Sequence, residues 1–411
     1  MSISWKPLTC ICACLVAVNF DSLIAAGVTP LNASAAAHRH SGLPRYAITD
    51  LGTRLSIDPQ YLDMPIPLAL NNRGDVAGSV VISTKKKTRI LRAAVMHTGQ
   101  LKFLPRLQGF DHSYACGIND YGDVAGYGEN VDGSSEPVRT TDVAFIWRSD
   151  GAHPLPGHKD DMVVSAWGIN NNGEVVGYTR ASDIYPVNSP THPIIWRTWQ
   201  RSSKSISHPT ELQNRLMTNT LIPTLTGIES YGMAINNHGW IVGYAEIGAS
   251  DMNLGPTHVF LWKDGELSDL GALPDPDHLL RLDSSGTARP EKDFECNMPA
   301  SINDRGDVVG FSYVSGMSER DDYTGFLYRG KMTSLGSGKP ASINNNGEIV
   351  GEVHGRAVIW IGSKKHFLDD LLIRRRGWHL EHAQAINNRG QIAGFGVLHG
   401  HRHTYLLTPL R

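Results

Sequence analysis

The stretch "AINNHGWIVGYAE", Ala234–Glu246, decides the fold because close copies of it recur along the chain. In each copy Asn can bond its own backbone two residues on, and Gly accepts the positive φ that ends a tight reversal. The β-branched and aromatic run after the Gly is typical of a strand. Each copy therefore predicts an antiparallel hairpin. The seven copies lie at 69–79, 117–127, 168–178, 234–244, 301–311, 342–352 and 385–395.

Two further apolar segments follow most hairpins, for example "HVFLW" (258–262) and "GELSDLG" (265–271). Repeated units of four short strands, apolar on both faces, are typical of propeller blades. The terminal "HTYLLTPL" (403–410) lacks a fourth strand, which "RYAITDLG" (45–52) resembles. We predict an all-β, seven-bladed β-propeller of four-stranded antiparallel blades, the last blade closed by the N-terminal strand. A solenoid with capping units is the alternative.

The first forty residues differ from the rest. Lys6 precedes the apolar run "LTCICACLVAV" (8–18), and "AAA" (35–37) offers a small-residue cleavage site. The pattern predicts a secretory signal peptide over 1–37, a linker over 38–44 and a single propeller domain over 45–411. The protein is then secreted or periplasmic, with no membrane span in the mature chain. An uncleaved N-terminal anchor is the alternative, although the run is short for a full span.

The charge balance gives no reason to expect a nucleic-acid partner. Charged residues make up 19% of the chain, and the formal net charge is −2. Nucleic-acid binding needs a basic surface, which this composition does not indicate.

The consecutive segments "HVFLWKDGELSDLGAL" (258–273) and "SINDRGDVVGFS" (301–312) resemble the HAF-repeat family of bacterial extracellular proteins. The resemblance runs from about Arg45 to the end, and the unit at 192–231 departs from it by a polar insertion. It implies export and a propeller-like fold. It implies no activity and no catalytic residues.

The residues repeated in every hairpin are best explained as turn chemistry rather than as catalysts. An acidic residue follows the turn Gly in five copies, and either lines one mouth of the channel or begins a solvated strand. His192, His258 and His403 share one strand-start position, but their units are too far apart for one metal site. The acidic residues are Asp75, Asp123, Glu174, Asp307 and Glu348.

The segment "LHGHRH" carries a separate candidate metal site. His399, His401 and His403 alternate, so a strand would place them on one face, where three imidazoles can bind a transition metal. A surface loop with incidental histidines is the alternative. Acidic loop pairs would suit acid–base work on glycans, but nothing selects one of them. They are Asp160, Asp161, Asp275, Asp277, Asp321 and Asp322.

The long insertions fall on one face of the predicted propeller, where binding usually resides. A basic sector is expected there, because in a closed ring only the seventh blade separates the lysine run of the first blade from the arginine run that follows the sixth, and Arg402 lies on a loop of the seventh blade between them. It would suit an anionic polysaccharide or a lipid headgroup. Ordinary solvated loops are the alternative. The sector consists of Lys85, Lys86, Lys87, Arg374, Arg375, Arg376 and Arg402.

These observations predict an exported, non-enzymatic propeller that recognises a surface carbohydrate or a protein partner through its long-loop face. Two alternatives remain: a lyase or hydrolase with a site at the channel mouth, and a structural envelope component. We expect no catalytic residues, no cofactor and a monomer.

Overall fold

The computed structural model describes residues 43–53, 55, 68–83, 89–132, 139–158, 161–181, 190–197, 218–248, 256–273, 295–314 and 323–410. The predicted signal peptide, Lys85–Lys87 and five of the acidic loop residues (Asp160, Asp275, Asp277, Asp321 and Asp322) lie outside these residues. In the described part of the chain, no helix has the length and apolar character to cross a membrane.

The fold is all-β, and consecutive strands pair antiparallel in sets of four. The first set is β2 Ala69–Leu70, β3 Val76–Ser83, β4 Arg89–His97 and β5 Gln100–Phe103. The next is β6 His112–Ile118, β7 Val124–Asp132, β8 Arg139–Arg148 and β9 Gly151–Pro154. It is joined by one parallel bridge, Val163↔Asp142, to β10 Val163–Ile169, β11 Glu174–Arg180, β12 Thr191–Arg197 and β13 Thr218–Leu221. These two sets therefore count as one eight-stranded sheet.

Three further four-stranded sheets follow in chain order. The first holds β14 Ser230–Ile235, β15 Ile241–Glu246, β16 Thr257–Lys263 and β17 Glu266–Gly271. The second holds β18 Glu295–Ile302, β19 Val308–Val314, β20 Thr324–Tyr328 and β21 Met332–Ser337. The third holds β22 Lys339–Ile343, β23 Ile349–Val353, β24 Arg356–Ile361 and β25 Lys364–Phe367, and the short helix α2 Leu368–Leu371 follows it.

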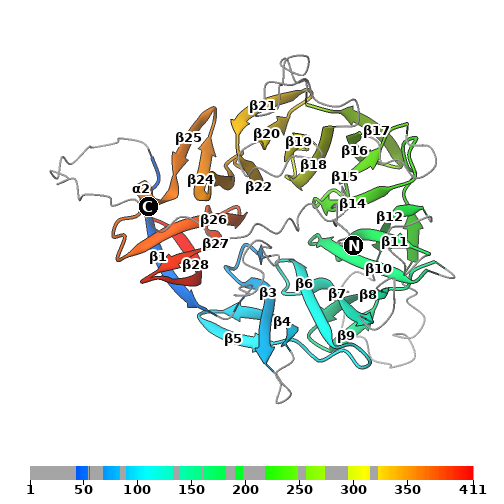
Figure 1. Ribbon diagram of the computed structural model, residues 1–411, viewed down its shortest axis with the longest axis horizontal. Helices are drawn as coiled ribbons and strands as arrows, with labels where there is room; N and C mark the ends of the chain where they lie inside the picture. The colour runs from blue at the N-terminus through cyan, green and yellow to red at the C-terminus, as the bar shows by residue number, and fades with distance from the viewer. Residues whose placement is uncertain are drawn as a thin grey trace, which may run out of the picture.

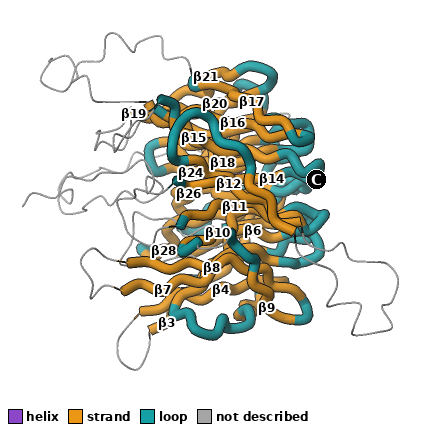
Figure 2. The backbone as a smooth tube through the Cα atoms, turned by 90° about the vertical axis from the view of Figure 1, so that its right-hand side faces the viewer, coloured by secondary structure: helices purple, strands orange, loops and turns teal. Residues whose placement is uncertain are grey.

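The last sheet contains both ends of the described chain. Its strands are β26 Trp378–Ile386, β27 Ile392–Leu398, β28 His401–Pro409 and, from the N-terminal side, β1 Tyr46–Gly52. β1 pairs antiparallel with β28, from Tyr46↔Pro409 to Gly52↔Thr404, as the sequence predicts. The sheets lie around a central axis, and the strands run between two ends of the molecule (Figures 1 and 2).

The Gly near the end of six of the seven motifs is required by the packing of the first two strands of its sheet. A bulge lies between Ala166 and Gly168 in β10, opposite Gly177 in β11. A Cβ on Gly177 would lie 1.9 Å from the carbonyl oxygen of Ser165, where no side chain fits. The same contact is 1.9 Å at Gly243 and 2.1 Å at Gly310. The motif therefore encodes the bulge as well as the turn.

Apolar side chains fill the space between neighbouring sheets. Trp147, Trp196 and Trp360 stand near the ends of the third strands β8, β12 and β24, and each is at most 1% exposed. Burying such rings supplies much of the stability of the sheet packing. The hairpin turns of the motifs lie outside this apolar core, at one end of the central axis.

Candidate functional site

Seven asparagines, the first of each motif, form a closed ring of hydrogen bonds at the hairpin end. We call it the inner ring. Each side-chain amide donates to the main-chain oxygen of the equivalent Asn in the next hairpin, at 2.9–3.3 Å. The bond from Asn387 to Asn71 closes the circle between residues 316 positions apart. The inner ring is Asn71, Asn119, Asn170, Asn236, Asn303, Asn344 and Asn387.

The hydrogen bonds of each inner-ring asparagine explain why the motif needs this residue. The Oδ1 atom of Asn303 accepts from the main-chain nitrogens of Arg305 and Asp307, both at 3.0 Å. Its amide nitrogen donates to Asp307 at 3.0 Å and to the main chain of Asn344 at 3.1 Å. Gly306 takes the positive φ of 83° that the turn demands. All four hydrogen-bonding positions of the buried amide are therefore used.

Three of the five recurrent acidic residues after the turn Gly do not occupy either predicted place. Asp75, Asp123 and Asp307 are at most 4% exposed, so they neither line the mouth nor begin a solvated strand. They accept hydrogen bonds from the inner-ring Asn of their own hairpin. Burial alone would raise the pKa of Asp307, but hydrogen bonds from Arg329, Asn303 and Arg305 lower it to about 2. These carboxylates are structural parts of the turn.

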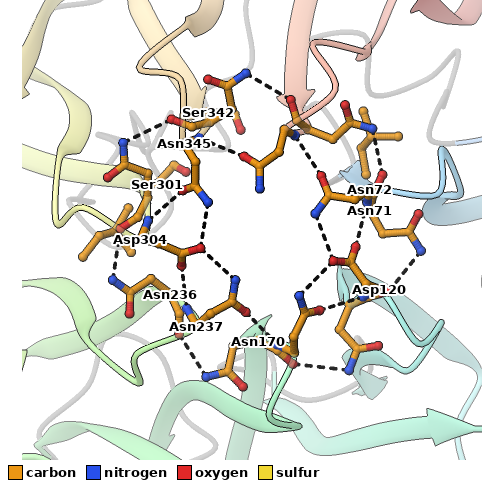
Figure 3. Close-up of a pocket in the computed structure, with 18 of the residues that line it drawn as sticks. Asn71, Asn72, Asp120, Asn170, Asn236, Asn237, Ser301, Asp304, Ser342 and Asn345 are labelled. Atoms are coloured by element: carbon orange, nitrogen blue, oxygen red, sulfur yellow. Dashed lines mark hydrogen bonds between the residues drawn. The ribbon is translucent and has the colours of Figure 1, made fainter.

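The residue after each inner-ring asparagine belongs to a second closed circuit, which we call the outer ring because its members are more exposed than the inner-ring asparagines. The main-chain nitrogen of each member donates to the side-chain oxygen of the next, at 2.7–2.9 Å. The bond from Asn388 to Asn72, 2.8 Å long, closes this circuit. The outer ring is Asn72, Asp120, Asn171, Asn237, Asp304, Asn345 and Asn388 (Figure 3).

Two members of the outer ring, Asp120 and Asp304, are carboxylates, and they lie on opposite sides of it (Figure 3). Asp120 also accepts from the amides of Asn72 and Asn171, at 2.9 and 2.8 Å. Asp304 accepts in the same way from Asn237 and Asn345. Burial opposes ionisation of Asp304, but these amides and the main chain of Asn237 lower its pKa below its ordinary value. Asp304 is therefore held as a fixed negative charge.

The two rings surround a cavity of about 200 Å³ on the central axis. Under the amides lies a layer of aliphatic side chains contributed by every hairpin, together with Ser301 and Ser342. Of the described residues that line it, none is basic. The cavity thus offers fixed amide groups and two carboxylates. The aliphatic layer consists of Leu70, Ile118, Ile169, Ile235, Ile302, Ile343 and Ile386.

The predicted basic sector is only partly described by the structure. Arg374, Arg375 and Arg376 form an exposed turn before β26. Arg375 donates to the main-chain oxygen of Asp369 at 3.0 Å and is paired with Asp370, so its charge is partly balanced. Arg402 is paired with Glu381 at 2.9 Å. Arg374 and Arg376 are thus the members best placed to meet a partner.

The histidines of the predicted metal site do not converge. His399 lies in the turn before β28 and packs beside Gly377, which places it next to the arginine turn. His403 instead contacts Asp50 of β1 at 2.9 Å. Among the described residues, no group of three His, Cys, Asp or Glu side chains could hold a metal ion.

The histidines at the shared strand-start position act as structural groups. His258 bonds Asp269 at 2.9 Å, just as His403 bonds Asp50, so each pins a third strand to the fourth strand of its sheet. Asp161, the described member of the acidic loop pairs, accepts from the main chain of His158 and from Thr179. It therefore also has a structural role.

The sequence interpretation missed the outer ring. Its signal was present, since the residue after the first motif Asn is Asn or Asp in all seven copies. That pattern is stricter than the one at the acidic position after the turn Gly. A turn explanation requires only the first Asn and the Gly. The second residue makes its bonds to the neighbouring hairpin, and such bonds become visible only when hairpins are placed side by side.

Comparison with known proteins identifies a family and several similar solved structures. A family model described as "Protein of unknown function (DUF3466)" matches residues 106–328. No curated protein matches the chain. Similar solved structures include the β-propeller domain of the Trilobed protease from Pyrococcus furiosus (10% identity, TM-score 0.49, covering 87% of this chain and 94% of that one). An α-L-arabinanase from Penicillium chrysogenum is another (11% identity, TM-score 0.37, covering 89% and 99%).

Proposed function

This chain belongs to the DUF3466 family, and we propose that it is an exported, non-enzymatic binding propeller of seven blades that holds a carbohydrate in its central cavity. The blade count is supported by the seven members of each hydrogen-bonded ring. The closure of the last blade by the N-terminal strand is supported by the pairing of β1 with β28. Export rests on the leader-like run at 8–18.

The single observation that carries the ligand class is the outer ring around the cavity. Sugar hydroxyls need donors and acceptors at fixed positions, and amides and carboxylates supply both. The ring members are held by bonds to their neighbours, so little conformational entropy is lost on binding. The volume of about 200 Å³ lies below the roughly 300–1,000 Å³ of pockets for drug-sized ligands. One sugar unit at the end of a chain is the ligand that fits.

The charge of the cavity selects among sugars. Asp120 and Asp304 supply two carboxylates, and the described lining holds no basic side chain. A uronic acid would meet uncompensated like charge, whereas an ammonium group would find a partner on either side of the ring. The cavity therefore favours amino sugars over neutral sugars, and neutral sugars over acidic ones.

A second candidate function, recognition of an anionic surface through the long-loop face, is favoured by one observation. The exposed Arg374 and Arg376 precede Gly377, which packs beside His399, so the arginine turn and the turn before β28 meet there. This surface would act independently of the cavity, because it stands at the opposite ends of the strands.

The proposed sugar site is tested by isothermal titration of the chain from residue 38 with glucosamine, glucose and glucuronate. We expect affinity in that order. The double variant Asp120→Asn/Asp304→Asn is the matched probe, because asparagine fills the other five ring positions and the hairpin tolerates it. It should abolish the preference for glucosamine over glucose and keep glucose binding. Equal affinity of the natural chain and the double variant for all three sugars, or no binding of any, would refute the site.

A further inference from the structure

A row of buried residues, all but one of them polar or charged, crosses three strand sets at the end opposite the rings. Cross-strand pairs and bridges join its members in order: Asp142, Val163, Arg180, Thr191, Glu229, Glu246 and Thr257. Two of the links are parallel bridges between neighbouring sets. Asp142 bridges Val163, and Thr191 bridges Glu229. A carboxyl-bearing residue therefore stands at both junctions.

The carboxyl groups of this row are buried, and those of Asp142 and Glu229 share one arginine. Asp142 is 8% exposed, Glu229 5% and Glu246 1%. Arg180, itself 6% exposed, supplies the positive charge that acts on both Asp142 and Glu229. Like charge is close at each junction, since Glu129 is the cross-strand partner of Asp142 and the main-chain nitrogen of Glu246 donates to Glu229 at 3.0 Å. Such a group favours its neutral form.

The hydrogen bonds of Asp142 agree with a neutral carboxyl. Its Oδ2 atom accepts from Ser165 at 3.0 Å, whereas Oδ1 has no hydrogen-bond partner among the described residues. A carboxylate so buried would leave a charged oxygen unsolvated. Burial, followed by Glu129, raises the pKa of Asp142 to about 7. Burial, followed by Glu246, raises that of Glu229 to about 7.

Two other places at the same end of the molecule show what the row lacks. The next junction is neutral: Thr257 and Asn297 exchange hydrogen bonds of 2.7–3.2 Å through side chains and main chain. Glu352, at the end of β23, has Lys339 and His382 beside it. Burial would raise the pKa of Glu352, but His382 and Lys339 lower it. The acidic junctions are thus a local feature.

We propose that the Asp142 and Glu229 junctions are proton-operated latches, which hold the β10–β13 set against its two neighbours when their carboxyl groups are protonated and loosen when the protons pass to solvent. The ligand is the proton, and nothing else is exchanged. The latches lie at the far end of the strands from the sugar cavity and do not depend on its function.

The direction of the effect follows from the groups that face each carboxyl. Asp142 faces Glu129, Arg180, Ser165, Tyr114 and Cys116; Glu229 faces Glu246, Arg180 and Tyr231. Ionising either carboxyl adds negative charge to an already acidic neighbourhood. The latches are therefore closed below about pH 5, and they loosen as the pH rises through about 7.

Hydrogen–deuterium exchange at pH 5 and pH 8, with labelling times scaled for the intrinsic exchange rate, tests the latches on the full chain. Peptides covering 161–169 and 228–232 should lose protection about tenfold or more at pH 8. Peptides covering 257–263 and 295–302, at the neutral junction, should keep theirs. Equal protection of the acidic junctions at the two pH values would overturn the proposal.

Variants make the test specific. Asp142→Asn and Glu229→Gln imitate the protonated groups, so each should keep its own junction protected at pH 8 and leave the other sensitive. A purely structural role would not separate the two junctions in this way. If one variant removed the pH sensitivity of both junctions, the latch proposal would be contradicted. If a variant fails to fold, the natural chain still decides through the contrast between acidic and neutral junctions.

Discussion

The two ends of the strands bury polar groups by opposite rules. At the hairpin end, each inner-ring asparagine has partners for its amide, and structural carboxylates such as Asp307 are matched by arginine. At the other end, the buried carboxyl groups of Asp142 and Glu229 share the positive charge of Arg180. A repeated motif can satisfy every copy with the same contacts, whereas the junction residues come from segments outside the motif. The difference suggests a rigid end and a responsive end.

The largest effect should come from breaking the inner ring. Asn303→Ala removes four hydrogen bonds, including one of the two that the main-chain oxygen of Asn344 accepts. We expect the free energy of unfolding to fall by about 3–4 kcal/mol in urea denaturation. Asn346→Ala is the control: this exposed turn residue has only a 3.5 Å contact to Asn388 through its side chain. Its cost should stay within about 0.5 kcal/mol, and equal costs would contradict the comparison.

The next effect is a stability maximum at mildly acidic pH. Raised pKa values near 7 mean that Asp142 and Glu229 stabilise the fold when protonated and lose that contribution as the pH rises from about 5 to about 7. Unfolding free energy should fall by about 2 kcal/mol per carboxyl over this range. Asp307, with a pKa of about 2, acts the other way, and its contribution is lost below about pH 4.

Urea denaturation at pH 3, 5 and 8 measures the unfolding free energy on the acid limb and on the alkaline limb of this pH dependence. Glu229→Gln should flatten the alkaline limb and leave the acid limb intact, while Asp307→Asn should do the reverse. A natural chain most stable at pH 8 would show that the junction carboxyls are ionised in the folded state.

A smaller effect is expected when a third carboxylate is added to the outer ring, and its size should differ between two positions. Asn171→Asp turns the 2.8 Å bond to Asp120 into a contact between two carboxylates. Asn388 accepts from Asn345 through its Oδ1 atom and makes no such bond, so Asn388→Asp keeps its acceptor and adds no close repulsion. We expect a loss of about 1–2 kcal/mol for the first variant and less than about 0.5 for the second, by thermal denaturation at pH 7. A larger loss for Asn388→Asp than for Asn171→Asp would mean that the hydrogen bonds of the ring do not decide where a carboxylate is tolerated.

The hairpins could be predicted because Asn, Gly and the apolar run act within one turn. The pairing of β1 with β28 could also be predicted, since an unfinished unit at one end matched a surplus strand at the other. The rings could not, because each of their bonds joins one hairpin to the next, and even those from Asn71 and Asn72 reach residues 48 positions away. The residues of the latches are even harder to recognise in the sequence. Asp142, Arg180 and Glu229 follow no shared spacing, and their importance comes from burial in a shared row.

The smallest effect on stability is expected at the exposed arginine turn, which belongs to the responsive end but takes no part in its buried row. Arg374→Glu with Arg376→Glu should change unfolding free energy by less than about 0.5 kcal/mol, because both side chains are exposed. Adsorption to an anionic polysaccharide such as alginate should nevertheless weaken at low salt, and the loss should shrink as salt screens the charges. Glu266→Lys, on the exposed β16–β17 turn, adds positive charge elsewhere and controls for net charge. If that change offsets the loss, adsorption follows total charge and the turn is no binding surface. If it does not, the long-loop face binds anions while the cavity at the opposite end rejects them, which sharpens the division of the molecule into two unlike ends.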